Sequence, residues 1–338
     1  MTYAPTWWYV LDPNSSDFFA LLVLLIDVPI MPMLFFVAGY FALPSLQKRG
    51  ARLFLKEKLV RIGIPWVLGV LLLAPLTTYL SYLSRHIPMG YLEFWATDFW
   101  GKMYQQSVYW FLGVLLFMFA VLSLVYSRSH RLRATTQRIS IPTRKPFVVF
   151  AAITTVAFFA ISLFFPIDHW THIYLLVFQP VRVPLYIGYY VLGLYAERHG
   201  WFTADGFKPE LGPWGATCLL SGLGYLACRW TDAQPTLLLA AGTAILFNVF
   251  CLSSSIAGVM FFRHKVHGAG GIWRSLAANS YSIYYFHPLI LYPLAYLFIP
   301  VSLPLFLKAP MLILLAWALA WGAGALVLKR VPLLREMF

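Results

Sequence analysis

Charged side chains are scarce in this chain. Asp, Glu, Lys and Arg make up 11% of its 338 residues, whereas a soluble domain carries about 25%. Hydrophobic residue types make up 61%, and they recur in blocks of about twenty residues, the length that crosses the hydrocarbon core of a bilayer as a helix. This composition excludes an ordinary soluble domain and indicates an integral membrane protein, with the lipid bilayer as a partner.

Acidic residues are scarcer than basic ones. The chain has 12 Asp and Glu against 25 Lys and Arg, which gives a formal net charge of +13. In a soluble protein such an excess suggests a nucleic-acid partner. Here the cations flank apolar blocks, where the retention of Lys and Arg on the cytoplasmic side during membrane insertion explains them. We therefore expect no nucleic-acid partner.

Cysteine is almost absent, with three in the chain. Cys218 and Cys228 fall on one predicted helix, where they would lie about 15 Å apart, too far for a disulfide. His86, His169 and His172 lie in predicted outer loops, and their spacing matches no metal motif. The sequence predicts neither a disulfide framework nor a metal site.

The apolar blocks predict helices rather than a membrane barrel, because barrel strands alternate polar and apolar residues over about ten positions. We expect an all-α polytopic transmembrane helix bundle in a single domain over residues 1–338. It would have an outer-face connector at 1–17, helices within 18–328 and a cytoplasmic tail at 329–338. The expected spans, about nine, are residues 18–43, 62–83, 108–127, 147–165, 173–195, 211–229, 235–261, 277–298 and 305–328.

The positions of the cations predict the orientation. Cations cluster after the first and third predicted spans, at residues 48–61 and 128–145, and twenty of the 25 Lys and Arg fall in alternate loops. Because basic loops stay in the cytoplasm, we expect these loops and the C-terminus there. With nine spans the N-terminal segment would then lie on the outer face.

Four motifs follow one another in an order that resembles the acyltransferase-3 family. The stretch MPMLFFVAGYF at 31–41 ends a predicted helix, and a basic loop leads to Arg61 with Pro65 four residues later. WFLGVLL at 110–116 and NSYSIYYFHP at 279–288 come next. The segment WYVLD at 8–12 is most similar to the glucan-modifying branch of that family.

This resemblance implies a bacterial inner-membrane enzyme with ten core helices and no permanently bound cofactor. It would move an acyl group, acetyl or succinyl, from cytoplasmic acyl-CoA to a hydroxyl of an exported sugar, with a glycan or glucan as acceptor. The resemblance does not predict an oligomeric state.

The chain departs from the family pattern at the first helix, which in the family carries an Arg and a His eleven positions apart. No Arg here is followed by a His at that spacing. Since the orientation also places Met1 outside, we expect a tenth helix with that pair to be encoded upstream of Met1. The alternative is an inactive shortened paralogue.

Three ionisable residues fall well inside predicted spans: Asp27, Arg182 and His287. Charge within a membrane is costly and commonly functional. The resemblance therefore makes His287 and Arg182 the candidate catalytic residues, His287 as a residue that lines and positions the site and Arg182 as a stabiliser of thioester charge. Two structural alternatives stay open: an ion pair between Asp27 and Arg182, or an imidazole bonded to the backbone carbonyl that Pro288 frees.

The resemblance also assigns the donor and acceptor sites. Arg61 and Lys58 are the candidates for binding the phosphates of CoA, because Arg61 stands at a helix entrance and cations suit phosphates. The candidates for lining the substrate site are Asp27, Gly39, Tyr40, Trp110, Tyr281 and Tyr284.

A transporter or flippase for a glycan or a small anionic substrate is the rival interpretation, in which the same intramembrane charges line a path. Composition does not separate the two classes. The order of the motifs favours the enzyme, and the chain shows no inverted repeat with paired broken helices of the kind found in many transporters.

Overall fold

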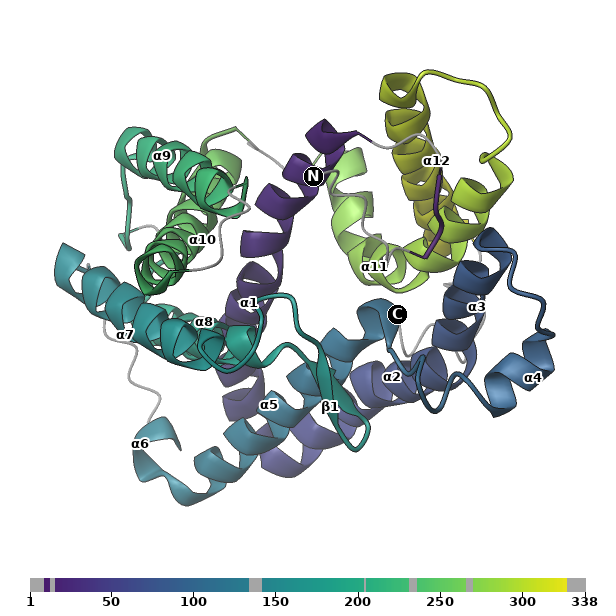
Figure 1. Ribbon diagram of the computed structural model, residues 1–338. Helices are drawn as coiled ribbons and strands as arrows, with labels where there is room; N and C mark the ends of the chain where they lie inside the picture. The colour runs from purple at the N-terminus through teal and green to yellow at the C-terminus, as the bar shows by residue number, and fades with distance from the viewer. Residues whose placement is uncertain are drawn as a thin grey trace. The chain divides into compact units, whose positions relative to one another are not determined.

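The computed structural model describes residues 9–12, 16–133, 142–203, 205–230, 236–265 and 270–326. Helices dominate this part of the chain (Figure 1), which confirms the predicted all-α class. The predicted tail at 329–338, and residues 1–8 and 13–15 of the predicted connector, lie outside the described residues. The longer helices are α1 (Asp17–Lys58), α3 (Ala74–Ser84), α5 (Trp110–Arg128), α7 (Arg144–Ser162), α8 (Val183–Arg198), α9 (Leu211–Trp230), α10 (Leu237–Lys265), α11 (Gly271–Leu297) and α12 (Leu305–Leu326).

Several helical segments are long and apolar enough to span a membrane. Within the described residues they number five: Asp17–Ser84, Ser107–Arg128, Arg144–Ser162, Leu237–Lys265 and Leu305–Leu326. The first of them contains two of the predicted spans. The predicted ranges 173–195, 211–229 and 277–298 hold the shorter or more polar helices α8, α9 and α11. The protein is therefore a multi-pass helical membrane protein.

The chain divides into two compact units. Unit 1 comprises residues 18–55 and 117–267, and unit 2 comprises residues 2–17, 56–116 and 268–338. Unit 1 holds most of α1 together with α7 to α10. Unit 2 holds α3, α11, α12 and the irregular helical segment that follows α1.

Helix α1 is longer than the predicted first span, because the basic segment after residue 43 is helical rather than a loop. Phe54 supplies the reason, since its ring is fully buried and packs edge-on against Phe119 at 5.5 Å. At Gly50 the backbone leaves the helical conformation with φ of 75°, a value that glycine adopts readily. The cations of this segment therefore lie on a broken helix.

The predicted fifth span is only partly helical. Strands β1 (Thr171–Ile173) and β2 (Leu176–Phe178) form an antiparallel hairpin in its first half, with His172 opposite Val177. Pro180 and Pro184 each stand in the first turn of a helical segment. Proline lacks the N–H that a preceding turn would need, so α8 begins at Val183. Arg182 consequently lies at the start of this helix and not at its middle.

Within unit 1, α9 packs along α10 (Figure 1), and α1 crosses α8 at very short range. A Cβ added at Gly39 would lie 2.1 Å from the carbonyl oxygen of Tyr190, and one added at Gly193 would lie 2.1 Å from that of Phe36. Only glycine lets two helix backbones approach this closely.

Within unit 2, α11 packs along α12 (Figure 1), and the described part of the N-terminal segment lies against α11. The ring of Tyr9 stacks on that of Tyr292 with centroids 4.4 Å apart. Two short π-helical segments, η1 (Leu59–Gly63) and η2 (Gly69–Leu73), flank α2 (Ile64–Leu68). Such segments displace backbone hydrogen bonds and are frequent at functional sites.

Candidate functional site

Arg182 lies at the centre of a charged cluster in unit 1. Its guanidinium is 4% exposed, and Nη2 lies 2.5 Å from Oδ2 of Asp27 on α1 and 3.6 Å from Oδ1 of Asp168. The guanidinium carbon also lies 5.6 Å from the centre of the Phe247 ring on α10. The ion pair between Asp27 and Arg182, one of the alternatives that the sequence left open, is confirmed.

Asp168 extends this cluster to α9. Its Oδ2 lies 2.6 Å from Nη2 of Arg229, so two arginines and two aspartates alternate. A buried guanidinium is tolerated when carboxylates neutralise it. The charge of Arg182 is thus already matched within unit 1, whereas its Nε has no hydrogen-bond partner among the described residues. The catalytic assignment of Arg182 stays a prediction.

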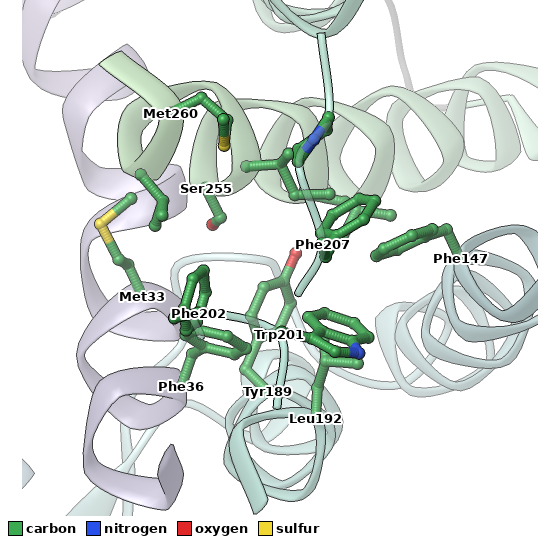
Figure 2. A pocket seen from close by; sticks show the side chains of 14 residues that line it. Met33, Phe36, Phe147, Tyr189, Leu192, Trp201, Phe202, Phe207, Ser255 and Met260 are labelled. Atoms are coloured by element: carbon green, nitrogen blue, oxygen red, sulfur yellow. The ribbon is translucent and has the colours of Figure 1, made fainter. Parts of the chain in front are cut away.

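An apolar pocket lies elsewhere in unit 1 (Figure 2). Its cavity volume is about 30 Å³, which is room for about one or two water molecules. Its lining comes from α1, α7, α8, α10 and the segment between α8 and α9, and consists of Met33, Phe36, Phe147, Tyr189, Leu192, Trp201, Phe202, Phe207, Pro209, Leu252, Ser255, Ile256, Val259 and Met260. Tyr40, a predicted lining residue, packs edge-on against Phe202 at 5.2 Å, whereas Gly39 forms the helix crossing described above.

Two of the family-like motifs meet in unit 2. The hydroxyl of Tyr281 donates to the carbonyl oxygen of Arg61 at 2.8 Å, and that of Tyr285 donates to the carbonyl oxygen of Pro65 at 2.8 Å. In a regular helix the Arg61 carbonyl would accept from the N–H of residue 65, which proline lacks. The tyrosines of α11 therefore stabilise the irregular backbone that carries Arg61.

The rest of the α11 motif also bonds to backbone. The hydroxyl of Tyr284 donates to the carbonyl oxygen of Val108, just before α5, and the ring of Tyr284 packs against Phe111 at 5.9 Å. Trp110, predicted to line the site, is buried at the start of α5. Tyr284 thus connects α11 to the segment that carries the Trp110 motif.

His287 makes the backbone contact that its sequence context allows. Its Nδ1 lies 2.7 Å from the carbonyl oxygen of Tyr284, the carbonyl that Pro288 leaves without its usual helical donor. An Nδ1–H that donates to this oxygen leaves Nε2 as the nitrogen with the lone pair. The imidazole is therefore oriented and retains one site that can accept a proton.

The side chain of Arg61 is exposed, in contrast to its bonded carbonyl. Lys58, three residues earlier, is half-buried at the end of α1. Cations at a helix entrance can bind phosphate groups. The geometry is compatible with the predicted donor role of both residues.

Two features were missed in the sequence. Lys308 in α12 is 1% exposed, and its Nζ lies 2.5 Å from Oδ2 of Asp12; a lone cation within the apolar range 305–328 was the available signal. The polar members of the apolar pocket, Tyr189 and Ser255, were also missed. The sequence shows only that residues 186, 189 and 193 recur on one face of α8.

Comparison with known proteins identifies the family of the chain. The family model for the acyltransferase domain Acyl_transf_3 matches residues 2–327, nearly the whole chain. The chain belongs to the acyltransferase-3 family. No curated protein and no solved structure is similar enough to match. The family assignment agrees with the resemblance seen in the motifs and does not extend to the glucan-modifying branch.

The range that matches the acyltransferase-3 family includes the motifs that contact one another in unit 2. The match includes Arg61, the Trp110 motif and the α11 motif, and these three segments are joined by the hydroxyls of Tyr281, Tyr284 and Tyr285. These hydrogen bonds therefore join the three matched segments into one cluster of unit 2.

Proposed function

We propose that this acyltransferase-3 protein moves an acyl group from cytoplasmic acyl-CoA to a sugar hydroxyl of an exported glycan. The family match over residues 2–327 carries the proposal, because it makes the chain a membrane acyltransferase. The asymmetry of the cations supports a multi-pass protein of a bacterial inner membrane with its basic loops and C-terminus in the cytoplasm, where acyl-CoA is found.

The donor site would be at Arg61 and Lys58. CoA carries a pyrophosphate and a 3′-phosphate, for which a guanidinium fork and an ammonium group are suited. The exposed side chain of Arg61, on a backbone whose carbonyl is bonded by Tyr281, supports this assignment. The protein would need no permanently bound cofactor, because CoA enters and leaves as a substrate.

The reaction requires a base. The acceptor hydroxyl oxygen attacks the thioester carbonyl carbon and forms the new C–O bond, the C–S bond breaks, and CoA leaves as a thiolate that takes up a proton. The proton of the hydroxyl passes to the base. The oriented imidazole of His287 offers Nε2 for this transfer.

Donor binding is tested on the purified protein in phospholipid nanodiscs, by titration with CoA and acetyl-CoA. Arg61→Ala should weaken the affinity for CoA about 10-fold, since it removes a charge-assisted contact. Arg52→Ala is the matched control, because Arg52 is an exposed cation on α1 without a proposed role. If CoA does not bind the native protein, acyl-CoA is not the donor. If Arg61→Ala leaves the affinity for CoA unchanged, Arg61 is not part of the donor site.

The role of His287 is tested separately by His287→Gln, measured as the release of CoA from acyl-CoA in the presence of a gluco-oligosaccharide. Gln retains a donor for the Tyr284 carbonyl but accepts no proton. Loss of about 10²-fold or more in kcat with an unchanged KM supports His287 as the base. A loss below about 5-fold assigns His287 to positioning and excludes it as the base.

A further inference from the structure

The charged cluster of unit 1 exposes its carboxylates and buries its guanidinium groups. The side chains of Asp27 and Asp168 are 44% and 47% exposed. Those of Arg182 and Arg229 are 4% and 22% exposed. Each arginine contacts one of the carboxylates, with an N–O distance of 2.5 Å in one pair and 2.6 Å in the other. The arginines therefore hold two carboxylates in fixed positions, and each carboxylate keeps an accessible side.

The accessible side of Asp27 lies at membrane depth. Asp27 comes ten residues after Asp17, the first residue of α1, which is about 15 Å along the helix. Its neighbours Ile26 and Ile30 are exposed apolar side chains, of the kind that face lipid. Because a carboxylate in contact with hydrocarbon is costly, the accessible side of Asp27 requires water or a polar ligand.

The backbone beside Asp27 is irregular at the same depth. The 3-10 turn η4 (Pro180–Arg182) connects the hairpin to α8, and Nη1 of Arg182 donates to the carbonyl oxygen of Asp27 at 3.4 Å. Non-helical backbone at membrane depth is found where it is buried in protein or lines a water-filled space. This backbone and the two half-exposed carboxylates therefore indicate polar surroundings on the same side of the cluster.

The charges of the cluster cancel, because two carboxylates face two guanidinium groups. A free anion gains little here, since the guanidinium groups lie behind the carboxylates. What the accessible side offers is hydrogen-bond acceptance. An ionised carboxylate has about four lone-pair sites, and the arginine contacts at Oδ2 of Asp27 and Oδ2 of Asp168 use only some of them. A neutral ligand with several O–H donors matches this arrangement.

We propose that Asp27 and Asp168 bind hydroxyl groups of an uncharged hexose residue of the acceptor glycan, and that Arg182 and Arg229 position the two carboxylates. This inference deepens the proposed function and rests on it in one respect, that the acceptor is a sugar. Adjacent hydroxyls of a hexose can donate to one carboxylate together. Hydrogen bonds of the O–H···O⁻ type are charge-assisted and stronger than neutral ones.

The predicted orientation places this cluster toward the outer side, where an exported glycan is found. Asp168 follows α7, which begins with the cations Arg144 and Lys145, and the positive-inside rule assigns these cations to the cytoplasm. Arg229 lies at the opposite end of α9 from Lys208, another predicted cytoplasmic cation. The carboxylates that bind the sugar are thus on the side opposite the basic loops.

Sugar binding is measured without acyl-CoA, by calorimetric titration of the purified protein in phospholipid nanodiscs. The probes are neutral pentasaccharides of glucose, mannose and galactose, with a pentamer of galacturonate as the anionic comparison and empty nanodiscs as the blank. We expect at least one neutral pentasaccharide to bind at least about 10-fold more tightly than the galacturonate, because the exposed carboxylates repel an anion. Binding of none of the neutral sugars, or equal binding of the anionic one, overturns the proposal.

Asp168→Asn locates the binding. The substitution keeps the shape of the side chain but removes its charge, so we expect the affinity for the neutral pentasaccharide to fall about 5- to 10-fold. Asp205→Asn is the matched control, because Asp205 is an exposed acid of unit 1 in the segment between α8 and α9. Equal affinities of the two variants exclude Asp168 from a sugar site.

The double variant Asp168→Asn/Arg229→Gln separates sugar binding from support of the fold. Asp168→Asn alone leaves Arg229 without its carboxylate, whereas the double variant restores a neutral, hydrogen-bonded pair. We expect the midpoint of thermal unfolding to recover in the double variant while the affinity for sugar stays about 5- to 10-fold below that of the native protein. Recovery of the affinity together with the stability shows that the cluster only supports the fold.

The outcomes also separate this site from the proposed function. Sugar binding that depends on Asp168, in a protein that does not bind CoA, supports the site and contradicts acyl-CoA as the donor. Transfer of an acyl group to the sugar that is unaffected by Asp168→Asn overturns the site and leaves the proposed reaction in place.

Discussion

The hydroxyl of Tyr281 on α11 donates a hydrogen bond to the carbonyl oxygen of Arg61 at 2.8 Å. It takes the place of the backbone N–H that Pro65 lacks. This hydrogen bond gives a physical reason for two motifs that lie far apart in the sequence. Pro65 has no N–H to donate to the Arg61 carbonyl, and the tyrosine of the α11 motif donates to it instead. The exposed guanidinium of Arg61 is thereby carried on a stabilised backbone.

Tyr281→Phe should lower the free energy of unfolding by about 1 kcal/mol, because it leaves the Arg61 carbonyl without its donor. Thermal unfolding of the purified protein measures the change, with Tyr296→Phe on the same helix as the control. Pro65→Ala, which restores an N–H, should reduce the effect of Tyr281→Phe in a double-mutant cycle. Strictly additive effects of the two substitutions would contradict this relationship.

Asp27→Asn should destabilise the protein by about 1–3 kcal/mol, because it leaves the buried guanidinium of Arg182 with the more distant Asp168 as its counter-charge. The figure is below that for a fully buried pair, since the Asp27 side chain is 44% exposed. The double variant Asp27→Asn/Arg182→Met should recover part of the loss. If Asp27→Asn has no effect on thermal unfolding, the ion pair does not stabilise the fold.

The pair of Lys308 and Asp12 should respond asymmetrically. Asp12→Asn leaves an ammonium group that is 1% exposed without its carboxylate, whereas Lys308→Met leaves a carboxylate that retains access to water. We therefore expect Asp12→Asn to reduce stability by about 1–2 kcal/mol more than Lys308→Met does. The reverse order, measured by chemical unfolding, would show that Lys308 is not effectively buried.

Acid should loosen the segment between α3 and α5. The hydroxyl of Tyr82 donates to Asp98, and Lys102 lies 2.9 Å from the same carboxyl; both contacts hold the pKa of Asp98 below its usual value. Because the pKa of Asp98 is lower in the folded protein than in the unfolded chain, the ionised carboxyl stabilises the fold at any pH above the ordinary carboxyl pKa. This stabilisation is lost as the pH falls through the pKa of the folded state. The protection of the amides of residues 91–104 from hydrogen exchange, measured against the intrinsic exchange rate at each pH, should decrease at low pH in the native protein but not in Asp98→Asn.

Hydropathy was sufficient to predict the helical membrane class, because long apolar blocks leave few other structures possible. It misplaced the start of α8, since the apolar and β-branched residues of the hairpin at 171–178 have the same hydropathy as a helix. Pro180 and Pro184 were the local signals against a continuous helix. The basic segment after residue 43 was likewise assigned to a loop, although Phe54 anchors it as a helix.

The candidate site was predictable where sequence spacing determines the contact. The bond of His287 to the Tyr284 carbonyl follows from Pro288 one residue later, and the pair of Asp27 and Arg182 follows from the rarity of intramembrane charge. The pocket with Tyr189 was not predictable. It depends on the close crossing of α1 and α8, and on rings contributed by segments that are distant in the sequence.

Transfer of a labelled acyl group tests the central claim most directly. Membrane vesicles that contain the protein, with the cytoplasmic face outward, receive acyl-CoA labelled in the acyl carbonyl together with a gluco-oligosaccharide acceptor. The account predicts that the label enters the oligosaccharide as an ester, in a one-to-one ratio with released CoA, and that Arg61→Ala reduces this transfer. Release of CoA without labelled ester, or transport of the oligosaccharide without acylation, would contradict it.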